Sequence, residues 1–277
     1  MGLDHRAFRP ASRHVLAWLA AAGLALALLA ATGTASASRT STRAGRAPAP
    51  GRTPLAGKII GIDPGHNGLN YTDPAFLDHQ VWNGREWEAC DTTGTRTAGG
   101  YTEARFNWNV AVYLRADLIK LGARVVMTRT SDHGIGPCVN TRAQILDRAR
   151  ADVSIDIHAD YGPSAGRGFT ILEPVADGPN DTIINPAIRF GRDVHAAMLR
   201  DTDVPVSDYY GHDGYISRDD LAGLNLTTMP KVLIECGNMN DASDAALPVR
   251  PSTQQMIAAA LAGAIVQFLT TLTWRFS

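Results

Sequence analysis

Residues 58–66 read Lys-Ile-Ile-Gly-Ile-Asp-Pro-Gly-His, an apolar run that ends in a proline and a glycine. A short run of β-branched residues bounded by turn residues is typical of a buried strand followed by a loop. Further apolar runs of the same kind follow along the chain. They occupy residues 124–128, 153–157, 169–172 and 232–234.

Segments with helical periodicity lie between most of these runs. In residues 103–121, apolar side chains recur at helical spacing, and Gly122 stands where such a helix would end. Further helices are predicted at residues 141–149, 185–200 and 253–272, whereas residues 67–100 predict an irregular excursion or a hairpin. Strands that alternate with helices predict an α/β fold. We therefore expect a single three-layer domain with a mostly parallel central sheet flanked by helices.

Polar side chains stand at the ends of three predicted strands and at the start of one helix. His66 follows the first strand, His158 ends the strand at 153–157, Glu235 follows the run at 232–234, and Glu103 opens the long helix. Functional sites gather at the carboxyl ends of parallel strands. Each residue alone also has a structural explanation, such as a loop histidine, a helix-capping acid or a buried ion pair.

Taken together, the four residues indicate a catalytic metal site. Two histidines and one carboxylate form a standard catalytic zinc site, which keeps a fourth position open. The remaining carboxylate is then free to act on water. The short H-E-x-x-H motif is absent, so the prediction rests on residues far apart in the chain.

The segments that carry these residues resemble the zinc-dependent N-acetylmuramoyl-L-alanine amidases of the amidase type 3 family. The resemblance runs from Lys58 to about Leu269, and several separated motifs occur in the family's order. The matching segments are residues 60–66, 100–103, 122–132, 141–159 and 232–237.

The resemblance implies a role for each of the four residues. In the family, the equivalents of His66, Glu103 and His158 hold zinc (Zn2+), and the equivalent of Glu235 is the catalytic acid/base. It thus implies hydrolysis of the amide bond between N-acetylmuramic acid and L-alanine in peptidoglycan, for cell-wall remodelling or turnover. A peptidoglycan-binding regulatory pseudoenzyme and a zinc peptidase that cuts within the stem peptide stay open as alternatives.

The chain departs from the family pattern near His158. Asp156 stands where the family usually has serine, and Asp160 where it usually has asparagine. Because Asp156 precedes His158 by two residues on one strand, it can face the same side and orient the imidazole. Its alternative role is a surface ion pair. Arg129 and Arg142 could meet substrate carboxylates, but structural ion pairs explain them better.

The N-terminus reads as an export signal. Three arginines precede the apolar run at 15–31, and Ala35-Ser36-Ala37 supplies a small-residue cleavage site. We expect a signal peptide at residues 1–37, a flexible linker at 38–56 and the zinc amidase catalytic domain at 57–277. An uncleaved membrane anchor is the alternative, although the run is short for a span of roughly 20 residues. The expected product is an exported monomer without stable membrane insertion, periplasmic, cell wall-associated or secreted.

The cysteines bear on the cellular compartment of the protein, and the net charge bears on the kind of partner that it binds. In an oxidising compartment, Cys90 and Cys138 are expected to form a disulfide because both lie in loop-like surroundings, while Cys236 ends an apolar strand as a free thiol. Three free thiols are the alternative. Residues 57–277 carry 19 basic and 26 acidic residues, a net charge of −7. This charge argues against nucleic acid and leaves peptidoglycan or muropeptide fragments as the expected partner.

Overall fold

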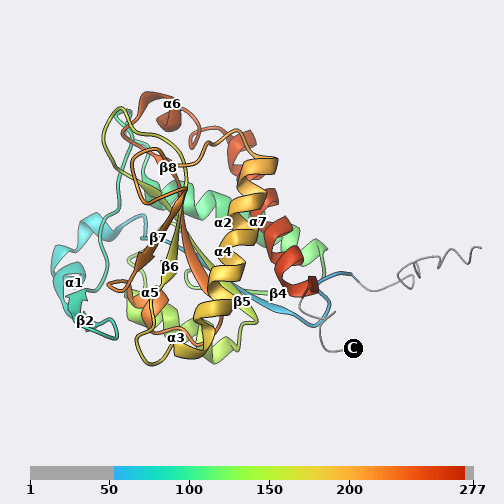
Figure 1. Cartoon of the computed structure of the whole chain (residues 1–277). Coiled ribbons are helices and arrows are strands. Elements are labelled where there is room, and N and C mark those ends of the chain that lie inside the picture. The colour runs from blue at the N-terminus through green and yellow to red at the C-terminus, as the bar shows by residue number, and fades with distance from the viewer. Residues whose placement is uncertain (1–52, 272–277) are drawn as a thin grey trace, which may run out of the picture. The chain divides into compact units, whose positions relative to one another are not determined.

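The computed structural model describes residues 53–271 (Figure 1). The predicted signal peptide, residues 38–52 of the predicted linker and residues 272–277 lie outside this part of the chain.

A six-stranded sheet forms the centre of the domain, with the strand order β4–β1–β5–β8–β6–β7. Among residues 53–271, neighbouring strands of this sheet run parallel except for β6 and β8, which run antiparallel. The predicted α/β class and mostly parallel sheet are therefore confirmed. The strands are β1 (Ile59–Pro64), β4 (Arg124–Met127), β5 (Val153–Asp160), β6 (Thr170–Pro174), β7 (Tyr215–Arg218) and β8 (Lys231–Asn238).

Helices cover both faces of the sheet and complete the three layers (Figure 1). Helices α2 (Glu103–Lys120), α4 (Ile184–Asp201) and α7 (Pro251–Thr271) pack together on one face. Helices α3 (Val139–Ala149) and α5 (Ala222–Asn225) lie on the other. By length and composition alone α7 could cross a membrane, but 61% of its most apolar window is buried in the domain, so α7 packs as a core helix in this structure.

Local sequence explains why α2 begins and ends where it does. The Thr102 hydroxyl accepts a hydrogen bond from the Arg105 N–H at 3.4 Å and so caps the first turn. Apolar residues then recur every four positions and face the main core. At the other end, Gly122 adopts a φ of 92°, which glycine reaches without strain because it lacks a Cβ. The residues of this stripe are Phe106, Val110, Leu114 and Leu118.

Several short elements were not predicted individually. The excursion at 67–100 contains a hairpin, one of its two predicted forms, made of β2 (Gln80–Trp82) and β3 (Trp87–Ala89). Strand β7 and helix α5 were missed because neither carries a long apolar run. The remaining short helices are η1 (Asn70–Thr72), α1 (Pro74–Asp78), η2 (Asp181–Ile183) and α6 (Ala242–Ala245).

Leu55, just before the predicted start of the domain at residue 57, contacts the main core. Leu55 is fully buried in the main core, and its N–H donates to the Leu121 carbonyl at 3.0 Å. Leu55, within the last residues of the predicted linker, is therefore packed into the core of the domain.

Leu55→Ala is expected to lower the free energy of unfolding by about 2–5 kcal/mol, because it removes a fully buried side chain. Denaturant unfolding of the mature protein measures this change. Ile119→Ala, at a position 46% exposed, is the matched control and should change stability by less than about 0.5 kcal/mol. Equal effects of the two substitutions would show that Leu55 does not anchor the domain.

Candidate active site

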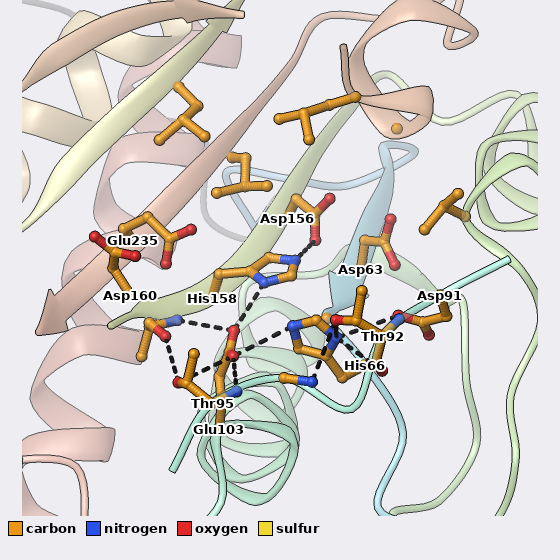
Figure 2. A pocket seen from close by; sticks show the side chains of 18 of the residues that line it. Asp63, His66, Asp91, Thr92, Thr95, Glu103, Asp156, His158, Asp160 and Glu235 are labelled. Carbon is orange, nitrogen blue, oxygen red and sulfur yellow. Dashed lines mark hydrogen bonds and ion pairs between the residues drawn. The ribbon is translucent and has the colours of Figure 1, made fainter. Parts of the chain in front are cut away.

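The three residues predicted to bind zinc lie together. One donor atom from each of His66, Glu103 and His158 lies within 4.8 Å of the others. Glu103 Oε1 is 2.8 Å from His158 Nδ1, and Glu103 Oε2 is 3.2 Å from His66 Nε2 (Figure 2). The loop after β1, the start of α2 and strand β5 thus bring two nitrogen donors and one carboxylate to one point.

Glu235 lies beside this group on the neighbouring strand. Its Cα pairs with that of His158 in the parallel β5–β8 register, so both side chains project from the same face of the sheet. Glu235 Oε2 is buried and has no hydrogen-bond partner within residues 53–271. Burial raises the pKa of Glu235 to about 8. A carboxylate of this kind can take up and release a proton near neutral pH.

Glu103 is fixed by the backbone around it as well as by the imidazoles. Its Oε2 accepts from the Thr95 N–H at 2.8 Å, and its Oε1 accepts from the Ala159 N–H at 3.2 Å and from Asn107 Nδ2 at 3.3 Å. Burial alone would raise the pKa of Glu103, but the two imidazoles hold it well below its usual value. The carboxylate therefore stays ionised in a place that attracts positive charge.

The backbone is built closely around the two imidazoles. A Cβ at Gly65 would collide with the His158 ring, and one at Gly94 would lie 2.6 Å from His66 Cδ2. His66 itself has a φ of 57°, which is uncommon for a residue with a Cβ. Such strain costs of the order of 1–3 kcal/mol and persists only where surrounding contacts enforce it. The absence of side chains at Gly65 and Gly94 and the strained backbone of His66 thus allow the two imidazoles to lie close together.

A second carboxylate stands behind each imidazole. Asp91 Oδ1 is 3.2 Å from His66 Nδ1, and Asp156 Oδ1 is 3.3 Å from His158 Nε2. The Asp156 contact is an ion pair without good hydrogen-bond alignment. Figure 2 shows His158 between Glu103 and Asp156, which confirms that Asp156 and His158 face the same side. Carboxylates in this position fix the ring orientation of metal-binding histidines.

Buried ion pairs connect these two carboxylates. Lys231 Nζ lies 2.7 Å from Asp63 Oδ2 and 3.4 Å from Asp156 Oδ2. Arg142 Nη1 lies 3.0 Å from Asp63 Oδ1, and its Nη2 lies 3.2 Å from Asp91 Oδ2. One continuous chain of charges therefore runs from His66 to His158. Sequence reasoning missed Lys231, whose only signal is a lysine directly before an apolar strand.

Arg129 and Arg142 are structural, as the sequence favoured. Each guanidinium has five N–H groups, and protein acceptors surround each of its three nitrogens. Neither side chain keeps a donor for a substrate carboxylate. The acceptors of Arg142 are Pro137, Asp63, Pro64, Thr128, His66 and Asp91, and those of Arg129 are Pro64, Ser131, Asp132, Gly65 and Ala104.

The predicted disulfide between Cys90 and Cys138 is present. Asp91 follows Cys90 directly, and Arg142 lies one helical turn after Cys138. The disulfide thus joins the two segments that form the Asp91–Arg142 ion pair. The remaining cysteine, Cys236, is a buried free thiol, and burial raises its pKa well above the usual value. A thiol of this kind is a poor nucleophile.

A cavity of 540 Å³ contains the candidate metal-binding group. Residues 91–95 of the excursion line the cavity together with His66, Glu103, His158 and Glu235, so the excursion covers part of the cleft. The cavity continues past Leu172 and Leu233 to residues that the sequence did not single out, including Glu88, Tyr210, Arg218, Leu221 and Ala222.

Known proteins are similar to this chain in sequence and in fold. The profile of the Amidase_3 family, described as N-acetylmuramoyl-L-alanine amidase, matches residues 60–267. An N-acetylmuramoyl-L-alanine amidase of Mycobacterium tuberculosis is 38% identical over 218 residues, which cover 78% of this chain and 88% of the relative.

Solved structures agree with the sequence match. A crystal structure of an N-acetylmuramyl-L-alanine amidase from Mycobacterium smegmatis is 38% identical with a TM-score of 0.74, covering 78% of this chain and 99% of the solved one. The apo form of the corresponding enzyme from Mycobacterium abscessus is also 38% identical, with a TM-score of 0.73 and coverage of 78% and 100%. The chain belongs to the Amidase_3 family of N-acetylmuramoyl-L-alanine amidases.

Proposed function

We propose that this peptidoglycan amidase is zinc-dependent and hydrolyses the amide bond between N-acetylmuramic acid and L-alanine. His66, Glu103 and His158 hold the ion, and Glu235 is the catalytic acid/base. The observation that carries the proposal is the convergence of three donors within 4.8 Å of one another, with an unpaired buried carboxylate oxygen of Glu235 on the adjoining strand.

The residues present fit a catalytic zinc ion. Two imidazole nitrogens and one carboxylate oxygen are a donor set that zinc takes in hydrolases, with the fourth position left for water or substrate. Both imidazoles also have the outer carboxylate partner that such histidines usually have. Glu235 needs no role as a ligand in this arrangement, so its carboxylate remains available for proton transfer.

The chain's own residues account for the proton movements. When bound, zinc supplies Lewis acidity, which makes water more acidic and polarises the carbonyl of the scissile amide. Glu235 takes the proton of the attacking water on its carboxylate and then donates it to the leaving nitrogen of L-alanine. Glu103 remains ionised through both transfers because the hydrogen bonds that it accepts from Thr95, Asn107 and Ala159 favour the charged form.

We further propose that the protein acts outside the cytoplasm, in the periplasm or cell wall or as a secreted enzyme. The Cys90–Cys138 disulfide supports an oxidising compartment, and the N-terminal sequence has the features of a cleaved signal. Peptidoglycan is also found outside the membrane, so enzyme and substrate would share the compartment.

Glu235→Gln is expected to bind zinc normally while hydrolysis of N-acetylmuramyl dipeptide falls by about 10²–10⁴-fold, the usual contribution of a general acid/base. Zinc content and mass analysis of the products measure the two quantities. Glu173→Gln, at a half-buried glutamate outside the cavity, is the control and should keep full activity. Near-normal turnover by the Glu235 variant would refute the catalytic assignment, and a wild-type cut within the peptide would identify a peptidase instead.

Asp156→Asn is expected to weaken zinc binding by about 10–100-fold, because it removes the charge that orients His158. Competition with a colorimetric chelator measures the affinity without relying on activity. Asp152→Asn is the matched control, since Asp152 also pairs with a lysine, Lys58 at 3.0 Å, but forms no ion pair or hydrogen bond with a histidine among residues 53–271. Unchanged zinc affinity in the Asp156 variant would leave Asp156 only as a partner for Lys231.

A further inference from the structure

We propose that the part of the cavity beyond Leu233 is a subsite for a stem-peptide residue that carries both a carboxylate and an ammonium group. Arg218 binds the carboxylate, and Glu88 binds the ammonium. This inference rests on the proposed amidase function and assigns a substrate class to the same cavity.

Arg218 differs from Arg142, the other arginine in the cavity wall, because it keeps unused N–H donors. Arg142 also lines the cavity, but its N–H groups are all occupied. Arg218 donates three hydrogen bonds, from Nε and Nη2 to the Asp220 carboxylate and from Nη1 to the Tyr210 hydroxyl. Within the described residues, one N–H on each terminal nitrogen is therefore left. A guanidinium so oriented can bind a second carboxylate.

Glu88 is a carboxylate in the same cavity wall that lacks a positively charged partner in the part of the chain that the structure describes. It is half-buried in the cavity wall and forms no ion pair among residues 53–271; its Oε1 accepts one hydrogen bond, from the Ala222 N–H at 3.3 Å. Burial raises the pKa of Glu88 to about 7, since no cation offsets the loss of hydration. A substrate ammonium would supply that missing charge.

Sheet register places Arg218 well away from Glu235. Thr170 pairs with Glu235 and Leu172 with Leu233, while Pro174 at the end of β6 pairs with Arg218. Arg218 thus lies four residues along the sheet and two strands across from Glu235. At about 3.3 Å per residue and 4.8 Å per strand, their Cα atoms are roughly 16 Å apart.

This separation suits a group some way along the stem peptide. The two side chains bridge part of the gap, and an extended peptide covers about 3.3–3.6 Å per residue, so Arg218 reaches a group about two to three residues beyond the scissile bond. The wall between the two ends is apolar, formed by Leu172, Leu221 and Leu233. It would accommodate the methylene groups of a long side chain.

The diamino acid of a peptidoglycan stem has this chemistry. When its side chain is not cross-linked, it combines a free amino group with a carboxylate on an aliphatic chain. Cross-linking consumes the amino group by forming an amide. The subsite would therefore favour unlinked stem peptides over cross-linked ones.

The test uses three N-acetylmuramyl tripeptides with isoglutamine in second position and a diamino acid in third. One is unmodified, one has the side-chain amino group acetylated, and one has the third-residue carboxylates converted to amides. For the wild-type enzyme with zinc, each modification is expected to lower kcat/KM about tenfold, mainly through KM, because a hydrogen-bonded charge is lost.

Two variants assign each charge to its partner. Arg218→Met should be insensitive to amidation yet remain sensitive to acetylation, and Glu88→Gln should show the reverse while still accepting the Ala222 hydrogen bond. Arg200→Met is the control for the first, since Arg200 pairs with its neighbour Asp201 in the same way but is exposed on α4. Glu173→Gln is the control for the second. Both controls should keep the wild-type discrimination.

Equal kcat/KM for the three substrates with the wild-type enzyme would overturn the subsite and leave the amidase function intact. So would variants that lower all three values equally. If the wild-type enzyme cuts none of the tripeptides, the proposed function fails instead. Calorimetric binding of the three free peptides to the zinc-loaded protein then decides the subsite, since weaker binding of both modified forms supports it and equal binding refutes it.

Discussion

The candidate metal-binding group depends on one buried ammonium group, that of Lys231, held between Asp63 and Asp156. Removing a charge from water costs several kcal/mol, and the cost is recovered only where close partners of opposite charge surround it. Here each partner serves a second purpose. Asp63 also holds Arg142, which holds Asp91 against His66, while Asp156 lies against His158. Through these ion pairs the lysine helps to orient two imidazoles, one from the loop after β1 and one from β5, although it contacts neither.

The same network also fixes the charge that a metal ion would meet. Within the described network, four buried carboxylates, those of Asp63, Asp91, Glu103 and Asp156, are accompanied by two buried cations, Arg142 and Lys231. The neighbouring buried cation, Arg129, is neutralised by its own partner Asp132. Two negative charges remain, and a divalent cation would neutralise them. The same carboxylates act on the imidazoles: burial lowers the pKa of His66, but Glu103 and Asp91 overcome this and raise it to about 9. The excess of carboxylates therefore favours a positive charge at this site, carried either by a metal ion or by protonated imidazoles.

The sequence predicted those parts that depend on local pattern. Long apolar runs and helical stripes identified the core strands and helices, and His66, His158 and Glu235 stood out because polar residues at the ends of buried strands need an explanation. Strand β7 escaped because Tyr-Ile-Ser-Arg at the sheet edge has no buried run. Asp91 and Lys231 escaped for a different reason. Their roles exist only through contacts across the fold, as between Lys231 and Asp63, which are 168 residues apart. Arg218 escaped for both reasons, since its place in the cavity depends on β7.

The two parts of the cavity are built differently, and this difference bears on how substrate preference can change. The catalytic part stands on central strands and on buried ion pairs, where a lost partner leaves an uncompensated charge. The peptide-facing part stands on the edge strand β7, the single-turn helix α5 and the β2–β3 hairpin, which meet through contacts such as Glu88 with Ala222 and Arg85 with Asp177 and Asp219. Short peripheral elements tolerate substitution because few core contacts depend on them. Substitutions in this wall would therefore disturb the metal-binding group less than substitutions among its buried ion pairs, so a peptide subsite built there could change while the centre is kept.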